Sequence, residues 1–268
     1  MKKIKIQCHS VLRYGISKIL VASTLVLMSA NAFADMSNCV SATKAENWNK
    51  AIEKCKPLVS ENSDALGLLA NAYAQSDKDY TARKYAQQFI DKYGKTEKNI
   101  IKLGGVYQSL GNYYYFGGNG AKKDIKKGLE YITKGAQLGN SIAQEQLGNF
   151  YLTEGEYPSQ NMATSYNWFE IASINGSQKA KQSYILTHLG DMKKEAGYCL
   201  AMGQQLVAQS YINGDAGLQK NDNQASKYLI QSIELYKESK DPNSEVLKHC
   251  PKQKGLDLAS AEKLLKSL

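Results

Sequence analysis

Proline is scarce in this sequence, with 4 residues in 268, and aromatic side chains make up only 9% of it. So few prolines do not fit a proline-rich low-complexity chain. An apolar content of 43% with 22% charged residues does not fit a disordered chain. The length allows one large domain or two small ones, and either can bury a hydrophobic core. The composition therefore predicts a folded, globular protein.

Acidic residues are absent from the first 34 positions, which hold five basic ones. The formal net charge of +9 would otherwise suggest a nucleic-acid ligand. Without this segment the chain has 29 basic and 25 acidic residues, a net charge of +4. Much of the basicity is local, so the composition predicts no nucleic-acid partner.

Long hydrophobic runs are also missing. The apolar run at 19–28 has about half of the roughly 20 residues that a helix needs to cross a bilayer. It follows a basic segment and precedes Ala32-Phe33-Ala34, whose small residues suit signal peptidase. We therefore predict a signal peptide over 1–34 and a soluble exported chain, which is periplasmic in a Gram-negative bacterium. A retained membrane anchor is the alternative. A lipid-modified Cys39 is disfavoured, because Met36-Ser37-Asn38 does not match a lipoprotein signal.

Cysteine is rare, and the four cysteines outside the leader form an even set. An even number in an exported chain favours two disulfides, and four cysteines allow three pairings. We expect Cys39–Cys55, because these residues flank a plausible turn between two short helices. We also expect Cys199–Cys250, which would tie the C-terminal segment to the body. A zinc site is the alternative, but no two of these cysteines have the short spacing of a metal knuckle.

Residues suited to catalysis are few. The exported part has only His188 and His249, and neither lies in a recognisable nucleophile or metal-ligand spacing. Glu154 and Glu156 resemble the paired carboxylates of a glycosidase, but a loop rarely holds two carboxylates at catalytic precision. The glycine-rich segment 117–120 lacks the lysine–serine pair of a phosphate-binding loop. We predict no enzymatic activity, no cofactor and no metal.

An internal repeat of 37 residues is the strongest feature that the sequence does contain. Leu110-Gly111 recurs as Leu147-Gly148, and Gly139 recurs as Gly176. Weaker copies lie upstream and downstream. Each copy has a small residue followed three places later by a tyrosine, at Ala70/Tyr73, Gly111/Tyr114, Gly148/Tyr151 and Ala208/Tyr211.

Each copy has the pattern of two amphipathic helices joined by a glycine-rich turn. The small residues predict where helices approach closely, and the tyrosines are predicted to fill the space between neighbouring units. A helix pair of this length cannot bury its apolar face alone, so the units must stack. The predicted fold is all-α, an α/α superhelical solenoid of helix pairs stapled by disulfides.

The pattern resembles the Sel1-like repeat, a relative of the tetratricopeptide repeat. Residues 110–140 match its leucine-glycine, tyrosine, glycine, aspartate and lysine positions well, and 141–177 match moderately. Residues 63–95 look closer to a plain tetratricopeptide unit. Exported members of this family with disulfides across helix pairs are known, which agrees with the expected cysteine pairing.

The predicted organisation is the signal peptide followed by one repeat domain over 35–268. The stretch 178–204 breaks the repeat spacing, and we expect an irregular extra helix there, beginning near Lys179 and interrupted at Gly190 or Gly197. The parts of the domain are an N-terminal helix hairpin at 36–57, units near 63–95, 98–140, 141–177 and 200–235, and a C-terminal cap at 240–268.

The family resemblance implies protein partners, bound along a concave face made by the first helix of each unit. The residue after the small one is an amide in all four units, at Asn71, Asn112, Asn149 and Gln209. Amides can hydrogen-bond both polar groups of a peptide backbone. Three places further on lie Ala74, Tyr115, Leu152 and Ile212. We interpret these columns as a peptide groove. A solvated face with ordinary packing between units is the alternative.

The run YYYF at 113–116 adds candidate contact area. Tyr114 takes the packing position, and Tyr113, Tyr115 and Phe116 cannot all be buried on one helical stripe. At least one is therefore predicted to be exposed, and Tyr115 and Phe116 join the predicted partner-binding set.

A lysine cluster at 122, 123, 126 and 127 is the densest outside the leader. It could bind an acidic protein, a cell-wall polymer or lipid headgroups. The alternative is that it is only the solvent-exposed start of a helix.

These features favour a non-enzymatic periplasmic scaffold or adaptor that binds protein or peptide partners. The resemblance allows a role in assembly or regulation of a cell-envelope machine, such as a type VI secretion or cell-wall complex, with contacts to envelope proteins or the cell wall. An immunity protein that neutralises a periplasm-acting toxin is the alternative. A cell-wall hydrolase or β-lactam-binding enzyme is a third, less favoured one.

Overall fold

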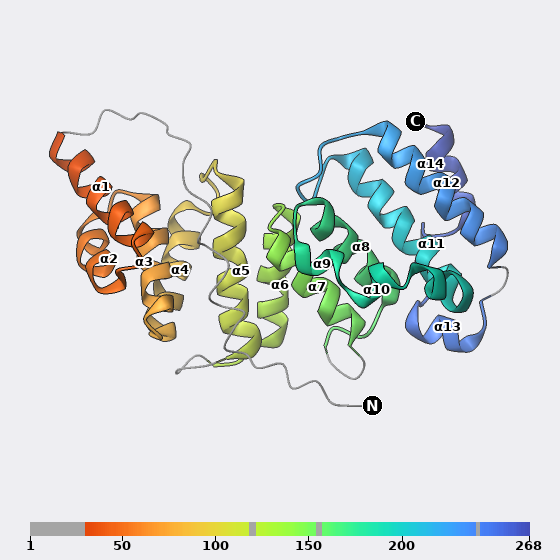
Figure 1. Cartoon of the computed structure of the whole chain (residues 1–268), viewed down its shortest axis with the longest axis horizontal. Helices are drawn as coiled ribbons and strands as arrows, with labels where there is room; N and C mark the ends of the chain where they lie inside the picture. Colours follow the sequence, from red (N-terminus) through yellow and green to blue (C-terminus); the bar gives the residue numbers. More distant parts are fainter. Residues whose placement is uncertain (1–29, 118–121, 154–156, 240–241) are drawn as a thin grey trace. The chain divides into compact units, whose positions relative to one another are not determined.

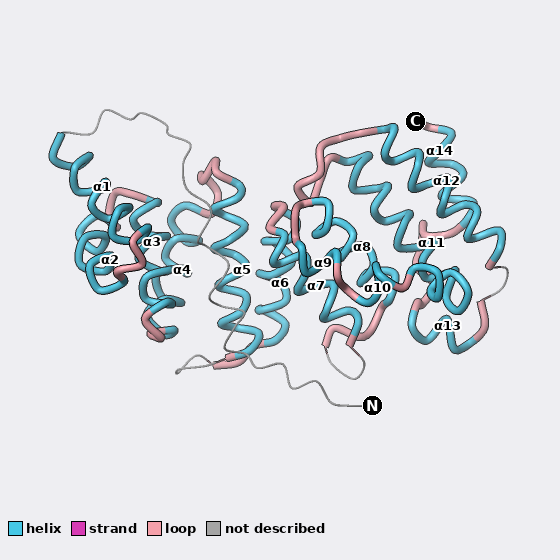
Figure 2. Tube along the Cα trace, in the orientation of Figure 1, coloured by secondary structure: helices cyan, strands magenta, loops and turns pink. Residues whose placement is uncertain are grey.

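Helices make up the regular structure of this protein. The computed structural model describes residues 30–117, 122–153, 157–239 and 242–268, with side chains from residue 35 onward. Within these ranges the only β-type pairing is an isolated bridge between Gln253 and Leu256, and all other regular elements are helices (Figure 2). The predicted all-α class is confirmed. Most of the predicted signal peptide (1–29), the glycines at 118 and 120, and Glu154 and Glu156 lie outside the described residues.

Packing between helices divides the chain into two compact units, 1–134 and 135–268, which are described separately. The first unit contains α1 (Ala30–Lys44), α2 (Trp48–Cys55), η1 (Lys56–Leu58), α3 (Ser63–Gln75), α4 (Asp79–Tyr93), α5 (Ile100–Phe116) and most of α6 (Ile125–Gln137) (Figure 1). The second contains α7 (Ser141–Leu152), α8 (Met162–Ile174), α9 (Gln178–Lys181), α10 (Tyr184–Thr187), α11 (Leu189–Asn213), α12 (Asp222–Glu238), α13 (Ser244–His249) and α14 (Leu258–Lys266). In both units successive long helices pack on one another, α1 to α5 in order in the first, and α7, α8, α11 and α12 in the second.

Asparagine begins most helices of the repeats. The side chains of Asn99, Asn140, Asn161 and Asn221 each accept a hydrogen bond from the backbone N–H three residues later. This bond satisfies one of the donors that a helix leaves unpaired at its first turn. The sequence thus marks where a helix starts independently of its apolar pattern.

A second repeated bond closes the loop between the two helices of a pair. The N–H of the residue that precedes the second helix donates to the carbonyl of the tyrosine near the end of the first. These bonds join Asp124 to Tyr114 at 2.7 Å, Asn161 to Tyr151 at 2.8 Å, and Asn221 to Tyr211 at 3.0 Å. The residue that precedes the second helix therefore follows the tyrosine by ten positions in all three pairs.

Glycine lets the two helices of a pair approach closely. A Cβ atom added at Gly111 would lie 2.6 Å from Ile132 Cγ1, 2.8 Å from the Ile132 backbone nitrogen and 2.9 Å from the Gly128 carbonyl oxygen. At Gly148 it would lie 2.8 Å from the ring of Phe169. The prediction that small residues mark close helix contacts is confirmed for Gly111 and Gly148.

Three of the four repeated tyrosines stack on an aromatic ring of the second helix of their own pair. Ring centroids are 5.4 Å apart for Tyr73–Tyr85, 5.7 Å for Tyr114–Tyr131 and 6.0 Å for Tyr211–Tyr228. Tyr114 also contacts α4 of the preceding pair, because its hydroxyl donates to Gln87. Aromatic stacking therefore operates within these three pairs, whereas the prediction placed the tyrosines between neighbouring units. Tyr114 does both, because it also packs against the apolar cluster that contains Ala86 of α4.

The irregular stretch after 177 differs in detail from the prediction. Instead of one helix starting near Lys179, two four-residue helices, α9 and α10, precede α11. Helix α11 is interrupted at Ala196, with φ −143° and ψ 42°, which is next to Gly197 and not at Gly190, the other predicted position. Buried Ala180, Ile185 and Met192 anchor this insertion on the core of the second unit.

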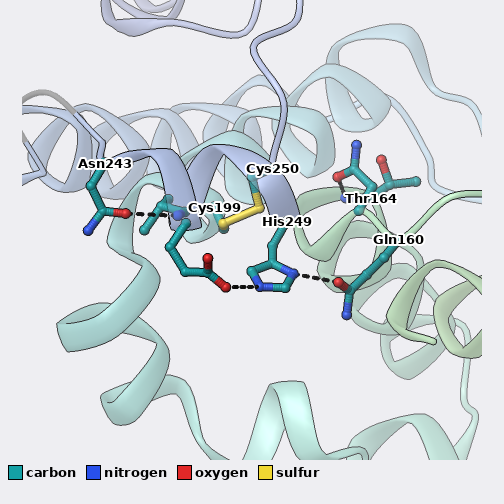
Figure 3. Close-up of a disulfide and its surroundings, with 9 residues drawn as sticks. Gln160, Thr164, Cys199, Asn243, His249 and Cys250 are labelled. Atoms are coloured by element: carbon teal, nitrogen blue, oxygen red, sulfur yellow. Dashed lines mark hydrogen bonds and ion pairs between the residues drawn. A yellow bond between two sulfur atoms is a disulfide. The ribbon is translucent and has the colours of Figure 1, made fainter. Parts of the chain in front are cut away.

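Both predicted disulfides are present. Cys39–Cys55 joins α1 to α2, and Cys199–Cys250 joins α11 to the end of α13. Beside the second bond, His249 Nδ1 lies 2.5 Å from Gln160 Oε1, and its Nε2 lies 3.2 Å from Glu245 (Figure 3). The C-terminal segment is therefore joined to the repeats by the disulfide and by the contact of the adjacent His249 with Gln160.

An ion-pair cluster joins the start of α3 to the start of α5. Lys102 Nζ lies 2.5 Å from the Glu97 carboxylate and 2.6 Å from that of Asp64. Glu97 also accepts hydrogen bonds from the Ser63 hydroxyl and the Asn99 backbone N–H. Burial alone would raise the pKa of Glu97, but the bonds from Lys102 and Asn99 favour the carboxylate and lower its pKa below the ordinary value.

Replacing Gly111 by alanine tests the close approach of α5 and α6. The added methyl group would meet backbone atoms that cannot move without shifting a helix, so we expect a loss of about 2 kcal/mol in the free energy of unfolding. Gly67→Ala is the matched control, because the nearest atom to its Cβ is 4.0 Å away. It should be neutral or stabilising by up to about 1 kcal/mol. Equal effects of the two changes in urea titrations would contradict the close approach.

Glu97→Gln tests the ion-pair cluster through its pH dependence. A lowered pKa in the fold means that the carboxylate stabilises the protein above its unfolded pKa of about 4.3. This contribution is lost as the pH falls through the folded value. We expect the variant to be about 1 kcal/mol less stable at pH 7 and closer to wild type at pH 3. Urea titrations at pH 7 and at pH 3 measure the two stabilities, and the exposed Glu61→Gln is the control. A stability difference at pH 3 as large as that at pH 7 would refute the role of the Glu97 carboxylate in the cluster.

Candidate partner-binding surface

The four predicted amides do not share one environment. Asn71 on α3 and Asn112 on α5 are buried, with 6% and 4% of their surface exposed. Asn149 on α7 is exposed, and its Nδ2 donates to the Glu145 carbonyl one turn earlier. Gln209 on α11 is half-buried. Only the last two, both in the second unit, present substantial side-chain surface.

The burial of Asn112 follows from the position of α5 within its unit. Buried residues occupy more than one face of this helix, at 103–105, 108, 110–113 and 115. A helix buried on several faces is covered on more than one side, so an amide there belongs to the interior. The expectation that Asn71, Asn112 and Tyr115 offer contact surface is therefore corrected.

The remaining predicted contacts are more accessible. Phe116 is 40% exposed, whereas Tyr113 and Tyr115 are buried, so the prediction of at least one exposed ring in this run is confirmed. Leu152 and Ile212 are half-buried and pack against the core of the second unit. A partner-binding role for Phe116, Asn149, Leu152, Gln209 and Ile212 stays a prediction.

A surface that combines aromatic rings with cations is the main feature that sequence reasoning missed. It lies on α4, α5 and α6 within the first unit, and we call it the aromatic–cationic face. Its members are Tyr80, Arg83, Tyr107, Tyr114, Lys127, Tyr131 and Lys134. Each cation lies over two rings at distances of 4.1–6.0 Å from nitrogen or Cζ to the ring centroid. Such contacts are attractive because a ring face carries negative charge density.

Tyr114 lies at the centre of this face. Lys127 Nζ lies 4.1 Å from its ring centroid and donates to its hydroxyl at 3.1 Å. Arg83 Cζ lies 5.6 Å from the same centroid. The hydrogen bond to Tyr114 raises the pKa of Lys127 above its ordinary value, so this lysine stays charged at neutral pH.

Positive charge is concentrated in the stretch of chain that contains these helices and the loops between them. Residues 79–137 contain 11 basic and 5 acidic side chains, a net charge of +6. The rest of the chain from 35 to 268 contains 18 basic and 20 acidic side chains, a net charge of −2. The net positive charge outside the predicted leader thus lies in residues 79–137, which include α4, α5, α6 and the loops that join them.

Helical spacing could have revealed part of this face. Tyr80 and Arg83 are three residues apart, Lys127 and Tyr131 four, and Tyr131 and Lys134 three. Residues three or four apart lie on one side of a helix. The contact between Arg83 and Tyr114 joins two helix pairs, and no local spacing predicts it.

Across the described ranges, no three His, Cys, Asp or Glu side chains come together as a metal-binding group. None of the helices in the same ranges is both long and apolar enough to cross a membrane.

Comparisons with known proteins identify the repeats. The model of the Sel1 repeat family matches residues 107–140, 141–177 and 199–236. The crystal structure of a Sel1 repeat protein from Oxalobacter formigenes is similar to this chain, with 15% sequence identity and a TM-score of 0.48. The similarity covers 89% of this chain and 96% of that one. None of the curated proteins matches this sequence.

Proposed function

The chain carries three Sel1 repeats, and from that premise we propose that it is a non-enzymatic, exported scaffold that binds protein partners in the periplasm. Sel1 repeats suggest a protein–protein interaction scaffold, and this observation carries the proposal. Stacked helix pairs expose long, side-chain-rich surfaces and hold them rigidly, which favours binding over catalysis. The scaffold would serve the assembly or regulation of a cell-envelope machine, such as a secretion or cell-wall complex.

The chemistry of the cysteines supports an exported protein. Disulfides persist in oxidising compartments and are rare in the reducing cytosol. All four cysteines of the bonds Cys39–Cys55 and Cys199–Cys250 are fully buried. The basic leader, the short apolar run and Ala32-Phe33-Ala34 supply the matching export signal in the sequence.

Export is tested on the protein expressed from its full sequence in a Gram-negative host. We expect it in the periplasmic fraction, with an N-terminus at or near Asp35. Non-reducing peptide mapping should recover the two disulfide pairs, because oxidation occurs after export. An intact N-terminus in the cytoplasmic fraction, with reduced cysteines, would refute the proposed location.

Partner binding is tested by cross-linking and affinity capture from the periplasm. We expect a defined set of captured proteins, weakened by the double change Asn149→Ala and Gln209→Ala by about tenfold if these amides contact the partner. The double change should leave the melting temperature within about 2 °C of wild type, because Asn149 is exposed and Gln209 is half-buried.

Exposed Asn223→Ala on α12, the second helix of its pair, is the control. It should leave capture unchanged. Failure of the wild-type protein to retain any protein above a bead-only background would refute the scaffold function. Unchanged capture by the double variant would refute only the role of the two amides.

A further inference from the structure

We propose that Arg83 and Lys127, which both contact the ring of Tyr114, bind carboxylate side chains of an acidic segment in a protein partner. This inference rests on the proposed scaffold function and names the chemistry of one partner. It places the binding site on the aromatic–cationic face of the first unit and not on the predicted amide columns.

Arg83 is held in place but its hydrogen-bond donors are unused. The side chain is half-buried, and its Cζ lies 5.5 Å from the Tyr80 centroid and 5.6 Å from that of Tyr114. In the part of the chain that the structure describes, Arg83 forms no ion pair and no side-chain hydrogen bond. A guanidinium has five N–H donors, and contact with a ring face leaves the donors at its edge available.

The shape of these donors selects a planar anion. Two parallel N–H groups of arginine match the two oxygens of a carboxylate, and such bidentate pairs are stronger than neutral hydrogen bonds. The two rings restrict the guanidinium before any ligand arrives. Less side-chain entropy is therefore lost on binding than for a freely mobile arginine.

Lys127 provides a second cation within the same face. One of its three N–H groups donates to the Tyr114 hydroxyl, which leaves two for a ligand. Among the described residues Lys127 forms no ion pair. Arg83 and Lys127 both contact the ring of Tyr114, so a single acidic segment can reach both.

Three of the five carboxylates within residues 79–137 have partners on their own helix or serve as a helix cap. Glu130 pairs with Lys134 at 2.7 Å, Asp91 accepts from Gln87, and Asp124 caps α6 by accepting from the Lys127 backbone N–H. With a net charge of +6 over residues 79–137, charge complementarity favours an acidic ligand. Tyr80, 56% exposed, adds flat apolar area next to the cations.

The test uses the purified protein and a fluorescein-labelled 12-residue peptide with glutamate at alternate positions. We expect fluorescence anisotropy to report binding that weakens with added salt. A peptide with glutamine at the same positions should bind at least tenfold more weakly. Because the peptide assay needs no cellular partner, its result is separable from that of affinity capture.

Arg83→Gln should weaken binding of the glutamate peptide about tenfold. Arg83→Lys should weaken it at least threefold, because lysine keeps the positive charge but lacks the two parallel N–H donors of the guanidinium. Exposed Lys227→Gln on α12 removes the same charge from the second unit and should change affinity less than twofold. Circular dichroism checks that each variant is folded. If Arg83→Gln is destabilised, Lys127→Gln takes its place, with at least a threefold loss expected.

Three outcomes overturn the proposal. Equal losses for Arg83→Gln and Lys227→Gln would mean that only diffuse charge attracts the peptide. Full binding by Arg83→Lys would exclude bidentate recognition. A sulfated polysaccharide whose binding depends on Arg83, while glutamate-peptide binding does not, would assign the face to a different polymer. In each case capture of protein partners through other surfaces would leave the scaffold function intact.

Discussion

Close approach of the two helices in each pair is the constraint on which the other features of this structure depend. Gly111 in α5 faces Ile132 and Gly128 in α6, and Gly128 in turn faces the backbone of Tyr115. The two glycines therefore remove side chains from both sides of one contact. At that separation the following tyrosine meets the aromatic ring of the second helix instead of solvent. The small-then-tyrosine order of the repeat is thus a single packing unit and not two independent preferences.

The loop chemistry agrees with this packing. The side chain of the cap residue accepts a hydrogen bond from the backbone N–H three residues later, and this bond fixes where the second helix starts. The backbone N–H of the same cap residue donates to the tyrosine carbonyl near the end of the first helix. In the pairs that begin with α5, α7 and α11, the start of the second helix therefore lies at the same position beside the end of the first helix. Local capping and non-local packing select the same register, and this agreement across levels is typical of sequences that specify one fold.

The sequence predicted correctly the features that depend on the spacing of residues along the chain. The 37-residue spacing predicted the helix pairs, and the flanking turn predicted Cys39–Cys55. The broken spacing after 177 predicted an interruption at Gly190 or Gly197, and the structure has it at Ala196, next to the second of these. It failed for Asn71 and Asn112, whose burial depends on which neighbouring helices cover them. The spacing of apolar residues indicates that a helix has an apolar side. A groove prediction needs the opposite side to be exposed, and a helix that is buried on several faces has no such exposed side. The contacts of His249 with Gln160, 89 residues away, were beyond local reasoning for the same reason.

In the aromatic–cationic face, the repeat determines where the aromatic rings lie, and residues outside the repeat determine which ligand can bind. Tyr114 and Tyr131 are placed by the repeat, because both take part in the packing of α5 on α6. Arg83 lies on α4, upstream of the first segment that matches the Sel1 repeat, and still contacts Tyr114. Its position is not required by the packing of α5 on α6, so it can vary without disturbing that pair. A ring held rigidly by the repeat can therefore orient a cation supplied by a helix outside it, and the identity of that cation decides which anion is bound.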